Sequence, residues 1–463
     1  MLIERVEKTV KKHGMLRDGN RVIAAVSGGP DSVCLFYVLL ELKKKYKFQL
    51  HVVHFNHHLR EKESKKEEKF VKELLDGTTV PLSIIGLDVK GYAEKQKIGI
   101  EEAARALRYQ NLLKLALKHD ADTIAIGHTA SDQAETVLMR IMRGSGPEGL
   151  EGIPPVRELS KNKFIIRPLI DVYREKIISY LKSRKIGYCL DSSNSKPVFL
   201  RNKVRIKLLP FIEKNFNRDI RSRLVNMADI FREENEYLSK AVDKAVESIS
   251  KHEDGRISVD FKKLIRYNKS FRRRIIHRIL ERKATYKNID SVIDIAEAGL
   301  TGAMVTISGF TVRKDYGQLY FIPSAEKHAV RKKIENRILF PGKTLLPEFS
   351  MEVETGITKN KPGFGKDKFT VYFDADRIDA GNLVIRSRRS GDRFLPFGAD
   401  GSKKLKQYFI DQKVPSYLRD DVPILEGGKR ILWVVGMRQA EEGRVTGNTK
   451  RIIKVKVRKM EKD

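Results

Sequence analysis

The chain has few cysteines and no long apolar run, and each shortage excludes several classes of protein. Only two of its 463 residues are cysteines, Cys34 and Cys189. They are too few for a disulfide scaffold, a four-thiolate iron–sulfur cluster or a cysteine-based zinc finger. No apolar run approaches the ~20 residues that cross a membrane. Residues 1–14 form a basic amphipathic pattern without the apolar stretch of a secretory signal. We therefore expect no membrane association and a cytoplasmic location.

Acidic residues are scarce relative to basic ones. The sequence has 60 Asp and Glu against 92 Lys and Arg, a formal net charge of +32. Hydrophobic residues make up 41%, enough for a globular protein and too many for a disordered polycation. A thermophile-style surface is the other explanation of high charge, but it usually adds both signs together. The excess of one sign favours a polyanionic partner, with nucleic acid as the leading candidate.

The first part of the chain alternates between short apolar runs and helical stretches. The runs cover residues 21–26, 49–55, 81–87 and 122–127, and each is rich in β-branched residues. Such continuous apolar runs are typical of strands buried on both faces of a parallel sheet. Helical patterns lie between them, for example at residues 99–118. This order predicts a doubly wound parallel α/β sheet with its ligand site at the carboxyl ends of the strands.

The pattern changes after Pro210. Residues 211–300 show no strand-like run and are predicted to be helical, and nine basic residues face one acidic residue over 266–287. Two apolar runs, 304–308 and 318–322, flank a polar segment and predict a hairpin. The remainder predicts a mixed α/β module up to residue 463. At about 150 residues per domain, the length suggests about three domains.

The first predicted strand leads into a glycine-rich turn and then an apolar helix over residues 33–42. A strand, a glycine-rich turn and a helix together form a cradle for phosphate, because backbone N–H groups and the helix N-terminus point at the anion. Asp31 would repel phosphates unless a cation lay between them, which predicts a magnesium ligand. An ordinary capped turn is the alternative. The turn comprises Ser27, Gly28, Gly29, Pro30, Asp31 and Ser32.

Polar side chains follow the fourth predicted strand. His128 lies at its carboxyl end, and Asp132 shares one helical face with Thr136 and Arg140, with Glu135 at the edge of that face. Two acids close to a phosphate-binding site could hold a substrate with an ammonium group. The alternative is an exposed helix face with i,i+4 ion pairs, each of little energetic value.

Arginines on two other segments are candidates for phosphate contacts. Arg105 and Arg108 are three residues apart on the predicted helix 99–118, so they are neighbours on one face. An arginine beside a phosphate stabilises the negative charge that develops when a bond to that phosphate breaks. Arg105 is the better candidate for a structural partner of a nearby glutamate. Arg201, Asn202 and Arg205 suit phosphate gating or RNA contact, although basic surface decoration is the alternative.

These motifs resemble a known superfamily. The hexapeptide at 27–32 resembles the signature loop of the ATP pyrophosphatases, also called PP-loop or N-type enzymes. Further segments resemble one of its families, the tRNA(Ile)-lysidine synthetases, and they are spread over both ends of the chain. They are His54 with 56–60, then 99–109, 127–136, Arg140, 143–144, 149–152, 167–169, 191–194, 201–205, 389–394 and 403–406.

The resemblance implies a specific reaction. Members of this family adenylate the carbon-2 oxygen of the wobble cytidine in the CAU-anticodon isoleucine tRNA. The ε-amine of free L-lysine then displaces AMP, so ATP and Mg²⁺ are the expected cofactors and the tRNA and lysine the expected partners. A PP-loop catalytic domain at 1–210, a helical tRNA-binding domain at 211–325 and a small mixed α/β tRNA-binding domain at 326–463 are implied. The oligomeric state stays open, with a homodimer as one alternative.

The resemblance also assigns roles to residues. It implies that the hexapeptide, His54, Arg108 and His128 bind ATP. It also implies that Asp132 and Glu135 bind lysine. The catalytic candidates are Asp31, Arg108, Asp132 and Glu135, with Asp31 as the metal ligand. Gating of the tRNA or the phosphates falls on Arg201, Asn202 and Arg205.

Three other functions compete with this interpretation. A tRNA thiolase of the same superfamily would need a pair or cluster of cysteines, whereas Cys34 and Cys189 are 155 residues apart in the sequence. A non-catalytic RNA-binding protein would not need the intact loop at 27–32. A small-molecule ATP pyrophosphatase would not need a charge of +32.

Overall fold

The computed structural model describes residues 2–57, 61–189, 200–253, 255–281, 284–324, 334–359 and 367–460. The chain divides into two compact units, Met1–Ser239 and Lys240–Asp463. Helix α11 (Ile220–Ile249) contains the boundary between them. The finer division at residues 210 and 325 stays a prediction. Within the described residues, no helix is long and apolar enough to cross a membrane.

A six-stranded sheet forms the centre of the first unit, in the order β3-β2-β1-β4-β6-β5. The first five strands in this order are parallel, and β5 pairs antiparallel with β6 at the edge. All four predicted strands are present, and the parallel α/β fold class is confirmed. The strand bounds are β1 Arg21–Ala25, β2 Gln49–Asn56, β3 Leu82–Gly86, β4 Thr123–Ala125, β5 Val156–Ser160 and β6 Lys163–Ile166.

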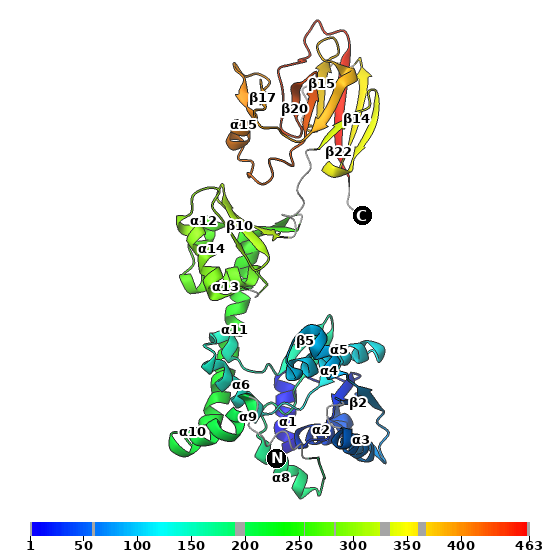
Figure 1. Cartoon of the computed structure of the whole chain (residues 1–463), viewed down its shortest axis with the longest axis vertical. Helices are drawn as coiled ribbons and strands as arrows, with labels where there is room; N and C mark the ends of the chain where they lie inside the picture. Colours follow the sequence, from blue (N-terminus) through cyan, green and yellow to red (C-terminus); the bar gives the residue numbers. More distant parts are fainter. Residues whose placement is uncertain are drawn as a thin grey trace. The chain divides into compact units, whose positions relative to one another are not determined.

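Helices cover both faces of this sheet (Figure 1). Val22 and Ala24 of β1 belong to one apolar core, and Ile23 between them belongs to the other. This alternation buries β1 on both faces, which explains why its sequence is apolar throughout. The helices are α1 Leu2–Lys12, α2 Pro30–Tyr46, α3 Glu61–Leu75, α4 Val89–Gln96, α5 Ile100–Lys118, α6 Ala130–Met142, α7 Pro147–Leu150, α8 Arg174–Ser183, α9 Leu200–Lys203 and α10 Leu209–Asn215, with a π-helical turn, η2, at Val204–Leu208.

The second unit begins with a helical region that also contains strands. The prediction that residues 211–300 lack strands is wrong at β7 (Ser250–Glu253) and β8 (Arg256–Asp260), which form a short antiparallel pair. Their sequences are polar, and β8 is paired on its other side by β11 (Gln318–Pro323). The helices of this region are α12 Phe261–Leu264, α13 Lys269–Ile279 and α14 Tyr286–Ala298.

The predicted hairpin of 304–308 and 318–322 is also corrected. Strand β9 (Met304–Ile307) does not pair with β11, because the polar segment between them is itself a strand, β10 (Phe310–Asp315). Its charged residues hid it, although Val312 is fully buried. The sheet order is β7-β8-β11-β10-β9.

The C-terminal residues form two further sheets, β12-β16-β19-β20-β21 and β13-β14-β22-β15, around a core that contains the single tryptophan, Trp433. A two-stranded ribbon, β17-β18, and one helix complete the module. The bounds are β12 Glu335–Arg337, β13 Gly342–Leu346, β14 Met351–Thr358, β15 Thr370–Asp374, β16 Leu383–Arg386, β17 Arg393–Phe394, β18 Lys403–Lys404, α15 Leu405–Asp411, β19 Ile424–Gly427, β20 Arg430–Val434, β21 Arg438–Gln439 and β22 Ile452–Lys459.

Candidate active site

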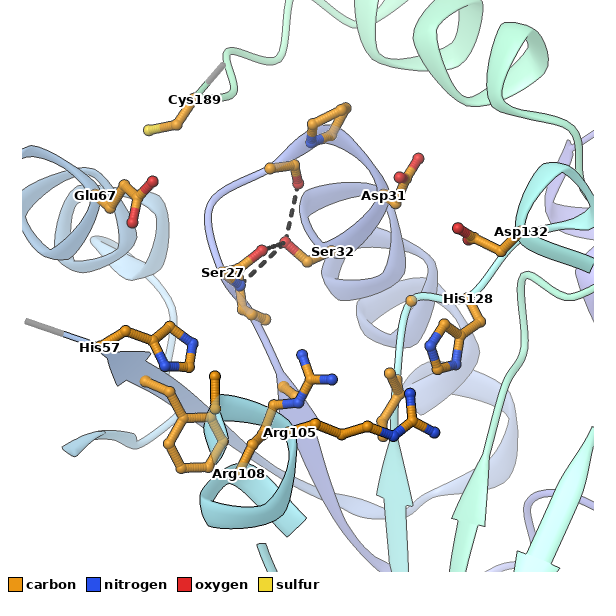
Figure 2. A pocket seen from close by; sticks show the side chains of 18 of the residues that line it. Ser27, Asp31, Ser32, His57, Glu67, Arg105, Arg108, His128, Asp132 and Cys189 are labelled. Atoms are coloured by element: carbon orange, nitrogen blue, oxygen red, sulfur yellow. Dashed lines mark hydrogen bonds between the residues drawn. The ribbon is translucent and has the colours of Figure 1, made fainter. Parts of the chain in front are cut away.

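A cavity of about 610 Å³ lies at the carboxyl ends of the parallel strands. It is lined by residues that lie within three positions after the ends of three neighbouring strands: Ser27 after β1, His57 after β2 and His128 after β4. This is the edge at which the doubly wound fold predicts a ligand. In the view of Figure 2, Asp31, Asp132 and His128 lie on one side of the cavity, and His57, Glu67 and Cys189 lie on the other.

The glycine-rich turn has the geometry of a phosphate cradle. Gly28 has a φ of +90°, a conformation that favours glycine, and Pro30 begins α2, with Gly29 at its N-terminal cap. No side chain caps α2, so its N-terminal N–H groups remain available to an anion. The Ser32 hydroxyl fixes the turn: it accepts a hydrogen bond from the Ser27 backbone N–H (3.1 Å) and donates one to the Gly29 carbonyl (2.9 Å).

Asp31 projects from the first turn of α2 and is held on one side only. Its Oδ2 accepts a hydrogen bond from the Arg174 guanidinium at 3.1 Å, whereas its Oδ1 is buried without a hydrogen-bond partner. Burial raises the pKa of Asp31 to about 6, although Arg174 opposes this shift. A buried carboxylate oxygen without a partner is a fitting ligand for a divalent cation.

The described residues contain no group of three or more His, Cys, Asp or Glu that could hold a metal ion. This observation does not conflict with Asp31 as a magnesium ligand. Mg²⁺ usually takes only one or two protein carboxylates and completes its shell with phosphate oxygens and water.

Asp132 and Glu135 of α6 meet two arginines. The Arg201 guanidinium donates to Asp132 Oδ1 and Glu135 Oε2, both at 2.9 Å. The Arg205 guanidinium donates to Glu135 Oε1 at 2.6 Å and to Asp132 Oδ1 at 3.0 Å. Each guanidinium therefore bridges both carboxylates, and the four side chains form one neutral network, which we call the charge network. The alternative prediction, an exposed helix face with i,i+4 ion pairs, does not apply to these residues, because the Glu135 side chain is 0% exposed.

Only one of the two acids faces the cavity. Asp132 lines it together with Arg201 and Arg205, whereas the fully buried Glu135 does not. Asp132 also caps its own helix, since its Oδ2 accepts hydrogen bonds from the Thr129 N–H and hydroxyl. Burial disfavours the charge on Asp132, but the guanidiniums of Arg201 and Arg205 outweigh it and hold the pKa of Asp132 below its usual range.

Arginines of α5 line the same cavity. Arg105 and Arg108 both reach it, so Arg105 is not confined to the structural role that the sequence favoured for it. Their guanidinium carbons lie 5.3 and 5.9 Å from the centre of the Tyr109 ring, and that of Arg157 lies 4.7 Å from it. Burial lowers the pKa of Arg108, and its Nε has no hydrogen-bond partner. A desolvated guanidinium of this kind is available to an anionic ligand.

His128 is a neutral imidazole. The Arg167 Nε donates a hydrogen bond to its Nδ1 at 2.9 Å, so this nitrogen carries no proton. Burial lowers the pKa of His128 to about 3, and the Arg167 charge adds to the effect against the opposing charge of Asp132. His128 can therefore contact a nucleotide through a neutral ring.

Some predicted residues lie outside the cavity wall. His54 is 1% exposed, and its Nδ1 donates to the Val26 carbonyl at 3.0 Å, so it contacts the backbone just before the turn. Arg140 donates to the carbonyls of Gly149 and Gly152 and thus holds that loop. Residues 191–194 of the family pattern lie outside the described residues.

Most of the predicted site is nevertheless brought together. The predicted residues that line the cavity are Ser27, Gly29, Pro30, Asp31, Ser32, Arg108, His128, Asp132, Arg201, Asn202 and Arg205, while Gly28, His54 and Glu135 do not. Their roles stay predictions. Sequence reasoning gave no role to the partner residues Tyr109, Arg167 and Arg174. The family matches at 99–109 and 167–169 include Tyr109 and Arg167, and no quoted segment includes Arg174.

The cysteines do not form a reactive pair. Cys34 is fully buried in α2, and burial raises the pKa of its thiol to about 12. Cys189 lines the cavity, and burial raises its pKa as well. Because the thiolate is the nucleophilic form, neither environment favours sulfur transfer.

Comparisons with known proteins agree with this geometry. Residues 2–212 match the model of the PP-loop domain, and residues 383–456 match that of the TilS substrate C-terminal domain. A tRNA(Ile)-lysidine synthase of Clostridium tetani is 35% identical over 98% of this chain and 98% of its own length. A tRNA(Ile)-lysidine synthase of Caldanaerobacter subterraneus is 33% identical over 99% of this chain and 98% of its own length.

A solved crystal structure of a TILS C-terminal domain is 28% identical, covers 28% of this chain and all of that chain, and has a TM-score of 0.26. The two relatives align with nearly the full length of the chain, far beyond the phosphate-binding turn. The chain therefore belongs to the tRNA(Ile)-lysidine synthase family.

Proposed function

We propose that this protein is an ATP-dependent ligase that joins L-lysine to carbon 2 of the wobble cytidine in the CAU-anticodon isoleucine tRNA. The observation that supports this most strongly is the 35% identity, over 98% of the chain, to a tRNA(Ile)-lysidine synthase. The cavity adds the required chemistry, because it combines a phosphate cradle, arginines and a carboxylate within one site.

The first step is adenylation of the cytidine. The carbon-2 oxygen attacks the α-phosphorus of ATP, a new P–O bond forms, and the bond to the β-phosphate breaks to release pyrophosphate. The turn at 27–32 holds the leaving pyrophosphate through backbone N–H groups and the N-terminus of α2. Arg105 and Arg108 stabilise the charge that develops at the α-phosphate. The product is a base whose oxygen is now a good leaving group.

The second step forms the carbon–nitrogen bond. The ε-amine of lysine attacks carbon 2, the C–O bond breaks, AMP leaves, and the nitrogen loses a proton. Asp132 is the better candidate for holding the ammonium group, because it is the carboxylate that lines the cavity. Arg201 and Arg205 bond both carboxylates in this arrangement, so either acid accepts the lysine ammonium group only when one of these arginines moves. We therefore assign gating to these two arginines, with Asn202 beside them.

Asp31 is the candidate for holding Mg²⁺ beside the phosphates, through the carboxylate oxygen that has no protein partner. A bound Mg²⁺ would neutralise phosphate charge and favour departure of pyrophosphate. Arg174 fixes the other oxygen and so orients the carboxylate toward the cavity.

Labelled lysine tests the function directly. The full-length protein is incubated with ATP, Mg²⁺, labelled lysine and the unmodified tRNA, and AMP, pyrophosphate and label in RNA are measured. We expect lysine-dependent AMP and labelled RNA. Incorporation of sulfur from a donor instead of lysine would support the thiolase alternative, and RNA binding without AMP or pyrophosphate would support the non-catalytic one.

Replacement of Asp31 separates chemistry from RNA binding. Asp31→Ala should reduce adenylation at least 100-fold, because the phosphates then lose the cation that neutralises them, while tRNA affinity changes less than about twofold. Loss of tRNA binding in the same variant would mean that Asp31 has a structural role.

Sedimentation of the wild-type protein would test the homodimer, which stays a prediction.

A further inference from the structure

A second, apolar hollow lies beside the charge network. It has a volume of about 350 Å³ and is lined by apolar side chains from α6, α9, η2 and α10. Helices α6, α9 and α10 lie next to one another in Figure 1, and η2 contacts all three. Lys203 and Lys207 complete its lining. We call it the apolar groove, and its apolar residues are Met142, Leu200, Val204, Leu208 and Phe211.

Three of the five apolar side chains that line this groove are open to solvent, whereas Val204 is buried. The exposed fractions are 55% for Phe211, 48% for Met142 and 46% for Leu200. Phe216 is 76% exposed, and its ring centre lies 5.8 Å from that of Phe211, so the aromatic surface extends beyond the groove. A contiguous exposed apolar surface of this kind marks a binding site more often than a passive surface.

The charged residues that line the groove are both basic. Lys203 and Lys207 are exposed, and neither ammonium group has an ion-pair partner in the part of the chain that the structure describes. No acidic residue is among the described residues that line the groove. Apolar and aromatic surface flanked by unpaired cations fits a ligand that has flat faces and phosphates.

The groove shares its central segment with the candidate active site. Along α9 and η2, Arg201 and Arg205 contact the acids of α6 at the cavity, while Leu200, Lys203 and Lys207 line the groove. One short helical segment therefore contributes to both sites. An RNA chain whose reactive base lies in the cavity would have its neighbouring nucleotides within reach of this segment.

We propose that the apolar groove binds an unpaired nucleotide of the tRNA next to the reacting cytidine. Its base packs on Phe211 and Met142, and its phosphates contact Lys203 and Lys207. Stacking on exposed aromatic side chains combined with lysine–phosphate contacts is how proteins hold single-stranded RNA. The proposal rests on the proposed function for the identity of the RNA. The positive charge favours RNA over a second copy of this chain, whose net charge is also +32.

Two sets of variants test this assignment, with binding of the unmodified tRNA measured by fluorescence anisotropy. Phe211→Ala should weaken tRNA binding about tenfold, as loss of one base stack does, while Phe211→Tyr keeps the affinity. ATP affinity should stay unchanged in both variants. Phe211 is exposed, so its replacement leaves the core intact, which circular dichroism can confirm.

The lysines are tested through salt dependence. Lys203→Ala/Lys207→Ala should reduce the slope of log affinity against log salt by about 1.4, because two phosphate contacts are lost. The matched control is Lys90→Ala/Lys95→Ala on α4, which removes the same charge from exposed lysines that line neither cavity and should leave the slope unchanged.

Three results would overturn the proposal. They are an unchanged tRNA affinity of Phe211→Ala, equal salt-dependence slopes in the two double lysine variants, and a changed sedimentation coefficient of Phe211→Ala without any change in its tRNA binding. The last would assign the groove to a second copy. Failure of the proposed function looks different, because the wild-type protein would then bind the tRNA through the groove without attaching lysine.

Discussion

At the scale of single residues, the candidate site depends on partners that are far apart in sequence. Asp31 is oriented by Arg174, which is 143 residues away, and His128 is held by Arg167, which is 39 residues away. Motifs place residues on strand ends and helix starts, so they predicted the lining of the cavity well. They contain no information about such distant pairs, and the protonation states of His128 and Asp31 follow from those pairs and from burial.

The protonation of His128 should affect stability in acid. Its pKa is about 3 in the folded protein and near 6.5 when unfolded, so only the unfolded chain takes up this proton as the pH falls from about 6.5 toward 3. Stability is therefore lost over this window. His128→Gln should remove about 1–2 kcal/mol of that loss at pH 5. Urea unfolding of both proteins at pH 7.5 and 5 measures it, and a difference between them that does not change with pH would contradict the assignment.

Tyr109 should act as a positioning residue for the arginines of the cavity. Three guanidinium groups lie over or near its ring, and such contacts contribute up to about 2 kcal/mol when desolvated. Tyr109→Leu should raise the KM for ATP about 5- to 30-fold with little change in kcat. The control Tyr109→Phe keeps the aromatic ring and should retain the KM. Equal KM values in Leu and Phe variants would exclude a role of the ring.

At the scale of elements, the segment formed by α9 and η2 is fastened to α6 by the charge network. Both arginines project from this segment, and both carboxylates project from α6. The sequence predicted all four residues as functional but assigned them to separate tasks, because helical spacing relates residues only within one helix. The sequence did not predict strands β7, β8 and β10, because their composition is polar. They form strands because they pair with neighbouring strands, and a sequence pattern does not show this pairing.

Removal of one arginine should destabilise this contact. Arg205→Leu leaves the fully buried Glu135 with Arg201 alone and should lower the free energy of unfolding by about 2 kcal/mol or more. Arg221→Leu is the control, because its pair with Glu213 is partly exposed and should cost less than about 1 kcal/mol. The double variant Arg205→Leu/Glu135→Leu should recover part of the loss. Equal losses in the two single variants, measured by urea unfolding, would contradict the charge network's role.

At the scale of the whole molecule, the net charge of +32 is less available to RNA than the sequence suggests. Within the basic run of α13, Arg273 pairs with Asp290, and Arg272 pairs with Glu297. In the C-terminal module, Arg386 is 2% exposed and binds Asp392 and Glu426. Composition predicts a polyanionic partner correctly for this family. Only the ion pairs of the structure distinguish the basic side chains that stabilise the fold from those that are available to RNA.

The product of the reaction is the most direct test of the central claim. After incubation of the unmodified tRNA with the full-length protein, ATP, Mg²⁺ and lysine, the RNA is digested to nucleosides and analysed by mass spectrometry. We predict that one cytidine of the anticodon gains the mass of lysine minus one water, and only when ATP and lysine are both present. An unchanged cytidine at that position, together with intact ATP, would contradict it.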